Sequence, residues 1–324
     1  MDLNRDSYYS KEADWEYMSC SQYQNFCQCE AKAMAVIQGR WEEPPGEAFL
    51  VGNYFHTYFE SPEAHRQFVG ENADSIFLKQ TKKEAENGIL RLRAPFVHAD
   101  AMIKCATDDP LISNIINMPG ENEKILTGEL FGVPWRIRMD KYVPDGRLIV
   151  DYKTVANIWE TRWSEELHAR VSFIETYGYL FRAAVYSEIE KQNVNSQSDP
   201  QFLIIAISKQ DPPDKEVLLL NHRQRYDYEM ERIKEKLPYI QRVKQGLVRP
   251  RRCGVCDYCR ATKTLEVIKP YYVLMPEFRE GLEEDQNAGS LLDIPSEEAP
   301  VDGMSTMPGS SSMDSSGRQY VESL

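Results

Sequence analysis

The sequence predicts a mixed α/β domain in which helices flank a central sheet, and three observations carry this prediction. Segments with helical spacing come first along the chain, two strands joined by turn residues follow, and a helix and further strands come after them. This order differs from the regular alternation of a doubly wound fold. The chain has 324 residues, 42% of them hydrophobic, so it is long enough to bury a core of its own.

The N-terminal part contains three segments with helical spacing. The first, residues 21–38, follows a candidate serine cap and brings five apolar side chains near one helical face: Tyr23, Phe26, Ala31, Met34 and Ile37. Two further helices are predicted over residues 47–60, where aromatic side chains cluster, and over residues 95–106.

Two strands come next. In "GVPWRIRMDKYV", residues 132–143, Trp135, Ile137 and Met139 alternate with charged residues, which is the period of a half-buried strand. "PDG" at 144–146 is typical of a turn, and "RLIVDYKTV" at 147–155 reads as a second strand. We therefore expect the two strands to pair as a hairpin.

The C-terminal half predicts a long helical segment over 162–191, strands over 202–208 and 216–220, and a charged helix over 224–246. Residues 276–324 are rich in Ser, Gly, Pro and acidic residues and have no apolar periodicity, which indicates a disordered tail. The expected organisation is one domain over residues 1–275 and an acidic tail over 276–324.

Charge and hydropathy limit the functions that the protein can have. The net charge is −13, but residues 276–324 hold eleven of the 51 acidic and two of the 38 basic residues, which leaves −4 for the rest. Global charge therefore does not exclude DNA as a partner. No apolar run reaches the about 18 to 20 residues of a membrane span, and the N-terminus lacks the apolar stretch of a signal peptide. We expect a cytoplasmic protein without membrane contact, whose seven cysteines are reduced.

Two carboxylates and a lysine stand at the predicted hairpin. Asp140 ends the first strand, while Asp151 and Lys153 lie two residues apart on the second, where pleating aims them at the same face. Paired carboxylates suit Mg²⁺ or Mn²⁺, and a lysine beside them can orient water and offset phosphate charge. The alternative is a surface hairpin with an ordinary Lys–Asp pair, although the buried run "LIV" before Asp151 argues against it.

The stretch "GVPWRIRMDKYVPDGRLIVDYKT" resembles the active-site hairpin of the PD-(D/E)xK nuclease superfamily, in the branch of the RecB nuclease domain, lambda exonuclease and phage RecE-type exonucleases. The resemblance implies a restriction-endonuclease-like fold and a metal held by Asp140, Asp151 and the backbone carbonyl of Tyr152, with Lys153 catalytic. "GNYFHTYFE" matches the family's upstream helix and implies His56 as a metal ligand, with Glu60 one turn later. Taken alone, His56 would be a packed helix histidine.

The same branch carries a Q-x-x-x-Y helix after the lysine. In "YGYLFRAAVY" Tyr186 matches, which implies a catalytic role, but Arg182 stands at the glutamine position. An arginine there can contact a phosphate bidentately. The alternative for Tyr186 is an ordinary aromatic residue on the buried face of a helix.

Three cysteines in "RPRRCGVCDYCRATKT", namely Cys253, Cys256 and Cys259, indicate a metal site in a reducing compartment. The run is similar to that of AddB-type and CRISPR-associated nucleases, where one upstream cysteine joins three downstream ones around a [4Fe–4S] cluster. This resemblance implies Cys29 as the fourth ligand, with Cys27 in reserve. Zn²⁺ on the same four thiolates remains the alternative, because the second gap is shorter than is usual in the family.

Basic residues flank the cysteine run and suit phosphate contacts: Lys234, Lys236, Arg242, Lys244, Arg249, Arg251, Arg252, Arg260 and Lys263. Together these features predict a Mg²⁺-dependent DNA exonuclease of phage-type recombination or DNA end processing. By resemblance it would act on linear double-stranded ends beside a single-strand annealing protein, and relatives form oligomeric rings. The alternative is a non-catalytic DNA-binding module held together by a zinc or iron–sulfur clasp.

Overall fold

The computed structural model describes residues 3–5, 7–42, 46–265, 268 and 270–275. The chain forms two units, Met1–Thr262 and Lys263–Leu324. In the second unit the structure describes one short 3₁₀ helix, η1 (Tyr271–Leu274). The acidic tail expected over residues 276–324 lies outside the described residues.

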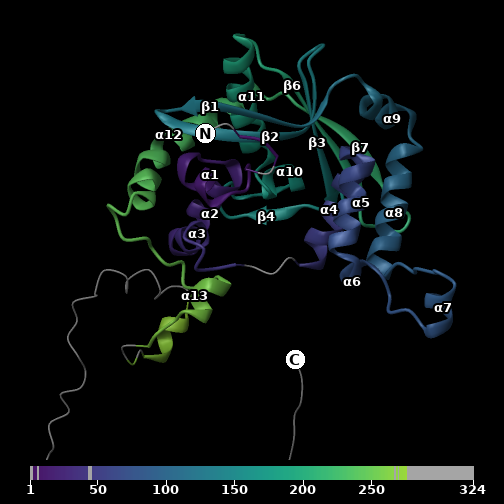
Figure 1. Ribbon diagram of the computed structural model, residues 1–324. Coiled ribbons are helices and arrows are strands. Elements are labelled where there is room, and N and C mark those ends of the chain that lie inside the picture. Colours follow the sequence, from purple (N-terminus) through teal and green to yellow (C-terminus); the bar gives the residue numbers. More distant parts are fainter. Residues whose placement is uncertain (1–2, 6, 43–45, 266–267, 269, 276–324) are drawn as a thin grey trace, which may run out of the picture. The chain divides into compact units, whose positions relative to one another are not determined.

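A five-stranded mixed sheet forms the centre of the first unit, with the strand order β1-β2-β3-β6-β7 (Figure 1). The strands are β1 (Glu121–Leu130), β2 (Val133–Val143), β3 (Leu148–Val155), β6 (Gln201–Ser208) and β7 (Lys215–Leu220). The β3–β6 pair is parallel and the other neighbours are antiparallel. The short strands β4 (Arg162–Ser164) and β5 (Ala169–Val171) form a separate hairpin.

Helices cover both faces of the sheet, as Figure 1 shows, and each face has its own apolar core. One core contains α2 (Cys20–Gln28), α3 (Glu30–Ile37), α11 (Tyr179–Val194) and α12 (Arg223–Lys244). The other contains α4 (Glu47–Glu60), α6 (Ala73–Ile76), α8 (Ala94–Thr107) and α9 (Pro110–Asn117). The remaining helices are α1 (Lys11–Glu16), α5 (Pro62–Glu71), α7 (Lys82–Glu86), α10 (Phe173–Thr176) and α13 (Asp257–Ala261).

Strand β3 explains why the apolar run precedes charged residues. Ile149 packs into the first core, whereas Leu148 and Val150 pack into the second, so the strand is apolar on both faces. The mixed α/β class and the β2–β3 hairpin are therefore confirmed. Gly146 in the connecting turn has a φ of 83°, a conformation that glycine adopts without steric cost.

Two sequence predictions are wrong. The helix predicted over 21–38 is split, because Cys29 adopts an extended conformation, with φ −161° and ψ 102°, and begins a new helix. The first third of the helix predicted over 162–191 is instead the β4–β5 hairpin. There the Ser164 hydroxyl accepts a hydrogen bond from the Leu167 N–H at 3.2 Å, a local turn that competes with helix formation.

Among the described residues, no helix combines the length and the apolar character that crossing a bilayer requires.

Candidate functional site

The predicted carboxylates lie at a fork between β2 and β3. The two strands pair at three positions, from Val143–Leu148 to Lys141–Val150, and Asp140 and Asp151 come next along each strand. Beyond the fork, Met18 takes the place of β3 beside β2, since its N–H donates to Pro134 O at 2.8 Å and its carbonyl accepts from the Arg136 N–H at 2.9 Å. The N-terminal segment thus bonds to the part of β2 that β3 has left.

Hydrogen bonds and ion pairs connect the residues on the two sides of this fork. The Tyr152 N–H, past the last β2–β3 pair, donates to Asp140 Oδ2 at 2.8 Å. Lys153 Nζ donates to the Tyr152 carbonyl at 2.9 Å, forms an ion pair with Asp151 and lies 3.9 Å from Asp140 Oδ2. The Asp151 side chain is only 3% exposed, so its charge depends on nearby cations.

Helix α4 brings His56 to the same place. Its Nδ1 lies 3.3 Å from Asp140 Oδ2, and its ring meets the Tyr152 ring edge-on at 6.2 Å between centroids. Burial lowers the pKa of His56 below its usual 6.5, although Asp140 opposes this shift, so the imidazole is neutral at neutral pH. Glu60, one turn later, pairs instead with Arg5.

Asp140 itself is held in the ionised form. Burial raises the pKa of its carboxyl, but His56, Lys153 and the Tyr152 N–H outweigh burial and bring the pKa below 3.8. A neutral imidazole beside an ionised carboxylate is the protonation state that metal ligands require.

Helix α11 contributes Arg182 and Tyr186. The Arg182 Nη1 lies 3.9 Å from Asp151 Oδ1 and 3.5 Å from the Tyr186 hydroxyl. That hydroxyl donates to the backbone carbonyl of Arg138 at 2.9 Å, two residues before Asp140. The contacts of Tyr186 are thus with the backbone of β2 and with Arg182, which suits a residue that positions the strand.

Sequence reasoning missed two residues at this site. Tyr179 places its ring 5.5 Å from Lys153 Nζ, and Glu123 on β1 lies within electrostatic range of Asp140 and Lys153. Glu123 belongs to β1, a strand that the sequence patterns do not predict, whereas Tyr179 lies within the predicted helix and is the first residue of α11. The apolar and β-branched run "ILT" at 125–127 was the available signal for β1, and it is a weak one.

The four predicted cysteine ligands come together. The Sγ atoms of Cys29, Cys253, Cys256 and Cys259 all lie within 4.8 Å of one another. In the part of the chain that the structure describes, this is the only group of three or more His, Cys, Asp or Glu residues whose ligand atoms are so closely spaced. His56, Asp140 and Asp151 are not among the residues of this group.

Local structure aims the sulfurs at a common point. The break at Cys29 turns its thiol toward Cys259, and the two Sγ atoms are 3.6 Å apart. The backbone N–H groups of Cys256 and Cys259 donate to Cys253 Sγ at 3.3 Å and to Cys256 Sγ at 3.4 Å. Burial raises the pKa of Cys253, but such N–H donors outweigh it and lower the pKa to about 6, which favours the thiolate.

Protein contacts also fasten this end of the unit. Glu30 accepts from the Arg251 N–H at 2.9 Å and from Arg251 Nε at 3.0 Å, and the Ala31 N–H donates to the Arg251 carbonyl at 2.9 Å. Lys244 is 5% exposed and donates to Tyr17 O and Gln22 Oε1. Lys244 and Arg251 therefore hold the N-terminal helices, and the expectation that Lys244 belongs to a DNA-facing basic patch is wrong.

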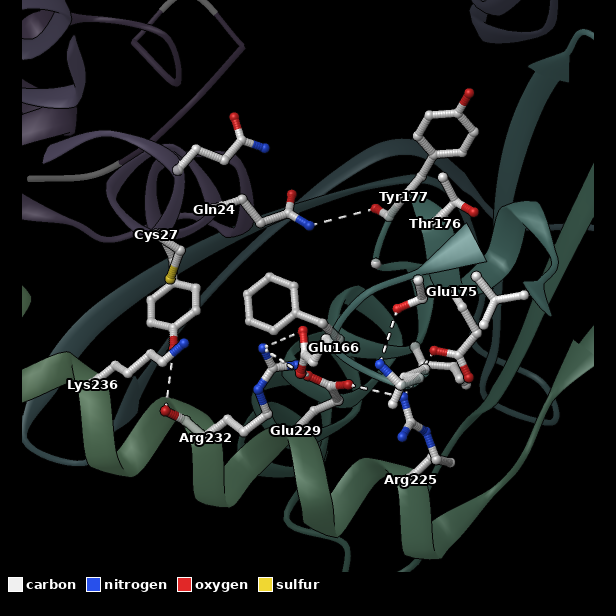
Figure 2. Close-up of a pocket in the computed structure, with 18 of the residues that line it drawn as sticks. Gln24, Cys27, Glu166, Glu175, Thr176, Tyr177, Arg225, Glu229, Arg232 and Lys236 are labelled. Carbon is white, nitrogen blue, oxygen red and sulfur yellow. Dashed lines mark hydrogen bonds and ion pairs between the residues drawn. The ribbon is translucent and has the colours of Figure 1, made fainter. Parts of the chain in front are cut away.

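The reserve ligand Cys27 lies elsewhere. It lines a cavity of about 570 Å³ between α2, the β4–β5 hairpin, α11 and α12 (Figure 2). Ion pairs cross this cavity from α12, with Arg225 2.8 Å from Glu175 and Arg232 2.9 Å from Glu166. The cavity is lined by neither the fork carboxylates nor the clustered thiols.

Comparison with known proteins fits this geometry. A crystal structure of a candidate exonuclease from Eubacterium rectale has 34% sequence identity and a TM-score of 0.76, over 85% of this chain and 99% of that chain. The structure of SSO0001 matches at 12% identity over 74% of this chain and 96% of that chain, with a TM-score of 0.26 that supports no argument. No curated protein matches the chain.

A family model described as "PDDEXK-like domain of unknown function (DUF3799)" matches residues 19–262. The matched range includes the fork, α11 and all four clustered cysteines. It confirms the resemblance to PD-(D/E)xK nucleases and the restriction-endonuclease-like mixed sheet. The chain therefore belongs to the DUF3799 family of PDDEXK-like domains.

Proposed function

We propose that the protein is a metal-dependent DNA exonuclease that hydrolyses phosphodiester bonds at the β2–β3 fork. The observation that carries this proposal is the meeting of Asp140, Asp151, Lys153 and His56, which come from two strands and a distant helix, at one place. The PDDEXK-like family and the candidate exonuclease from Eubacterium rectale support a nuclease.

The residues at the fork fit a hard divalent cation. His56, Asp140, Asp151 and the Tyr152 carbonyl would hold Mg²⁺ or Mn²⁺, which prefer oxygen ligands. Asp151 Oδ2 is buried and accepts no hydrogen bond, although Lys153 forms an ion pair with it. This carboxylate oxygen therefore has unused capacity for a ligand. When bound, the cation would polarise the scissile phosphate and lower the pKa of water.

Residues of the chain itself would orient the attacking water, bind the phosphate and position strand β2. Lys153 Nζ would orient the attacking water and offset negative charge on the phosphate, because it lies within 3.9 Å of both carboxylates. Arg182 would contact the phosphate, because its described contacts, at 3.5 and 3.9 Å, leave most of its five N–H donors free for a substrate. Tyr186 would position β2 through its hydrogen bond to Arg138 O.

We further propose that the four cysteines hold a metal that clasps the N-terminal helices to residues 253–259. The sulfur spacing favours zinc over the [4Fe–4S] cluster implied by the resemblance. A tetrahedral ion with bonds of about 2.3 Å places its sulfurs about 3.8 Å apart. The observed Sγ separations are 3.6 Å for Cys29–Cys259 and 3.9 Å for Cys253–Cys259. Thiolates on the four irons of a cubane must stand farther apart, at roughly 6 Å.

Phage-type recombination or DNA end processing, linear duplex ends as substrate, a single-strand annealing partner and a cytoplasmic location remain proposals that rest on the family resemblance. All seven cysteines are free thiols in the structure, which suits a reducing compartment. The alternative, a non-catalytic DNA-binding module with a metal clasp, predicts DNA binding without cleavage.

The test is digestion of end-labelled linear duplex DNA in Mg²⁺, with a covalently closed circle of the same sequence beside it. We expect nucleotide release from the linear DNA alone, and none after EDTA is added. Asp140→Asn should abolish the release, whereas Asp145→Asn, an exposed carboxylate in the connecting turn, should leave it unchanged. Binding of the linear DNA without any release would favour the non-catalytic alternative.

A further inference from the structure

We propose that Glu123 on β1 is a further carboxylate ligand of the divalent cation at the fork. This inference rests on the proposed nuclease function and adds a residue from a third strand to the site. Strand β1 belongs neither to the family motif nor to the β2–β3 hairpin. The position, the burial and the surroundings of the Glu123 side chain are what indicate this role.

The strand register brings Glu123 next to Asp140. Asn122 pairs with Lys141 and Lys124 pairs with Met139, so Glu123 and Asp140 are the intervening residues on the two strands. The pair is skipped in the ladder because Glu123 adopts a φ of 55°. A glutamate in this left-handed region is strained, and such strain is typical of functional sites.

Two negative groups facing each other across neighbouring strands destabilise a sheet unless a cation lies nearby. The Glu123 side chain is only 9% exposed, and its Oε2 forms an ion pair with Arg138 Nε at 2.8 Å but accepts no hydrogen bond. The groups around it are Asp140, Arg138, Arg5 and Lys153. Burial and the charge of Asp140 raise the pKa of Glu123 to about 7, while Arg138, Arg5 and Lys153 lower it.

Solvent can reach the site beside Glu123. A cavity of about 360 Å³ is lined by Arg5, Glu60, Ser61 and residues 121–125, which include Glu123. Solvent can therefore reach the surroundings of Glu123, and water can complete the coordination shell of a Mg²⁺ ion.

A purely structural role is the competing explanation, because Arg138 Nε lies 2.8 Å from Glu123 Oε2. In that case Glu123 would serve as the counter-ion that holds Arg138, whose guanidinium packs 4.8 Å from the Tyr9 ring. The two roles differ in one measurable property. A cation ligand changes the affinity of the protein for Mn²⁺, whereas a counter-ion of Arg138 changes stability alone.

The experiment titrates the full-length protein with Mn²⁺ in the absence of DNA and measures free Mn²⁺ by electron paramagnetic resonance. Glu123→Gln should weaken Mn²⁺ binding by about 10- to 100-fold. Glu123→Asp, which keeps a carboxylate, should lose less. The matched control is Glu121→Gln, an exposed residue on the same strand that pairs with Lys124 at 2.8 Å and should bind Mn²⁺ as the wild type does.

The outcome that overturns the inference is wild-type Mn²⁺ affinity in Glu123→Gln while Asp151→Asn has lost binding; the proposed function would then stand. If Asp151→Asn also binds Mn²⁺ normally, the metal site at the fork is itself refuted. Should Glu123→Gln unfold, Glu123→Asp decides the question: weaker binding by a folded Glu123→Asp supports the inference, and wild-type affinity overturns it.

Discussion

Replacing Lys153 by methionine tests whether the buried charges at the fork depend on one another. Lys153 is 14% exposed and forms an ion pair with Asp151, which is 3% exposed. Removing one partner of a buried pair costs about 3 to 5 kcal/mol, because the other charge is left uncompensated. Arg182, 3.9 Å from Asp151, compensates part of that charge, so we expect a loss of about 3 kcal/mol.

The assay is thermal unfolding of Lys153→Met with and without Mg²⁺. A loss of this size lowers the Tm by about 6 to 12 °C. Mg²⁺ should restore much of it, since a ligand at a hundredfold its Kd stabilises by about 2.7 kcal/mol and the variant no longer repels the cation. Lys124→Met is the control, because the Lys124–Glu121 pair is a surface pair worth about 0 to 1 kcal/mol.

Two results would refute this reasoning. If Lys153→Met unfolds at the same temperature as Lys124→Met, then Asp151 does not depend on the lysine for compensation. If Mg²⁺ stabilises Lys153→Met no more than it stabilises the wild type, the cation does not bind beside Asp151.

Three further predictions follow from other parts of the structure. Cys29→Ser should reduce the bound zinc from one equivalent to a small fraction, as measured by elemental analysis; a brown wild type with four irons per chain would contradict the zinc assignment. Arg182→Gln should raise the KM for DNA several-fold without changing Mn²⁺ affinity, and an unchanged KM would remove Arg182 from phosphate binding. Burial lowers the pKa of Lys244 from 10.5 to about 8, with Asp14 opposing and Arg136 reinforcing the shift. Between these values the unfolded state binds more protons, so urea unfolding should show wild-type stability rising by about 3 kcal/mol relative to Lys244→Met from pH 8 to 10.5. A constant difference between the two proteins would show that the ammonium carries no burial penalty.

The hairpin and its charges could be predicted from the sequence because their signals are local. Alternation in β2, turn residues at 144–146 and an apolar run before Asp151 each depend on neighbouring residues. The helix of His56 was equally visible, and its predicted bounds, 47–60, agree with those of α4.

The fork itself could not be predicted, because it depends on a contact that is remote in sequence. Met18 bonds to β2 beside Trp135 and excludes β3 from that length of the strand. The break at Cys29 has a similar origin, since the Ala31 N–H bonds to the carbonyl of Arg251. Helical spacing over 21–38 continues through the break, so the pattern gave no sign of it.

Glu123 was missed for a related reason. Its importance comes from its position opposite Asp140 in the sheet, and this position exists only once β1 pairs with β2. A single glutamate in a polar segment does not by itself indicate a metal ligand. Its burial can be recognised only once the neighbouring strand is in place.

The most direct test of the central claim is the rate at which Asp151→Asn releases nucleotides from linear duplex DNA at saturating Mg²⁺. The substitution keeps the shape of the side chain and removes the charge that faces Lys153. We predict a fall in rate of at least 1000-fold, which corresponds to about 4 kcal/mol of lost transition-state stabilisation, with DNA binding and metal content of the cysteine site retained. A variant that digests DNA at the wild-type rate would contradict the assignment of the fork as the catalytic site.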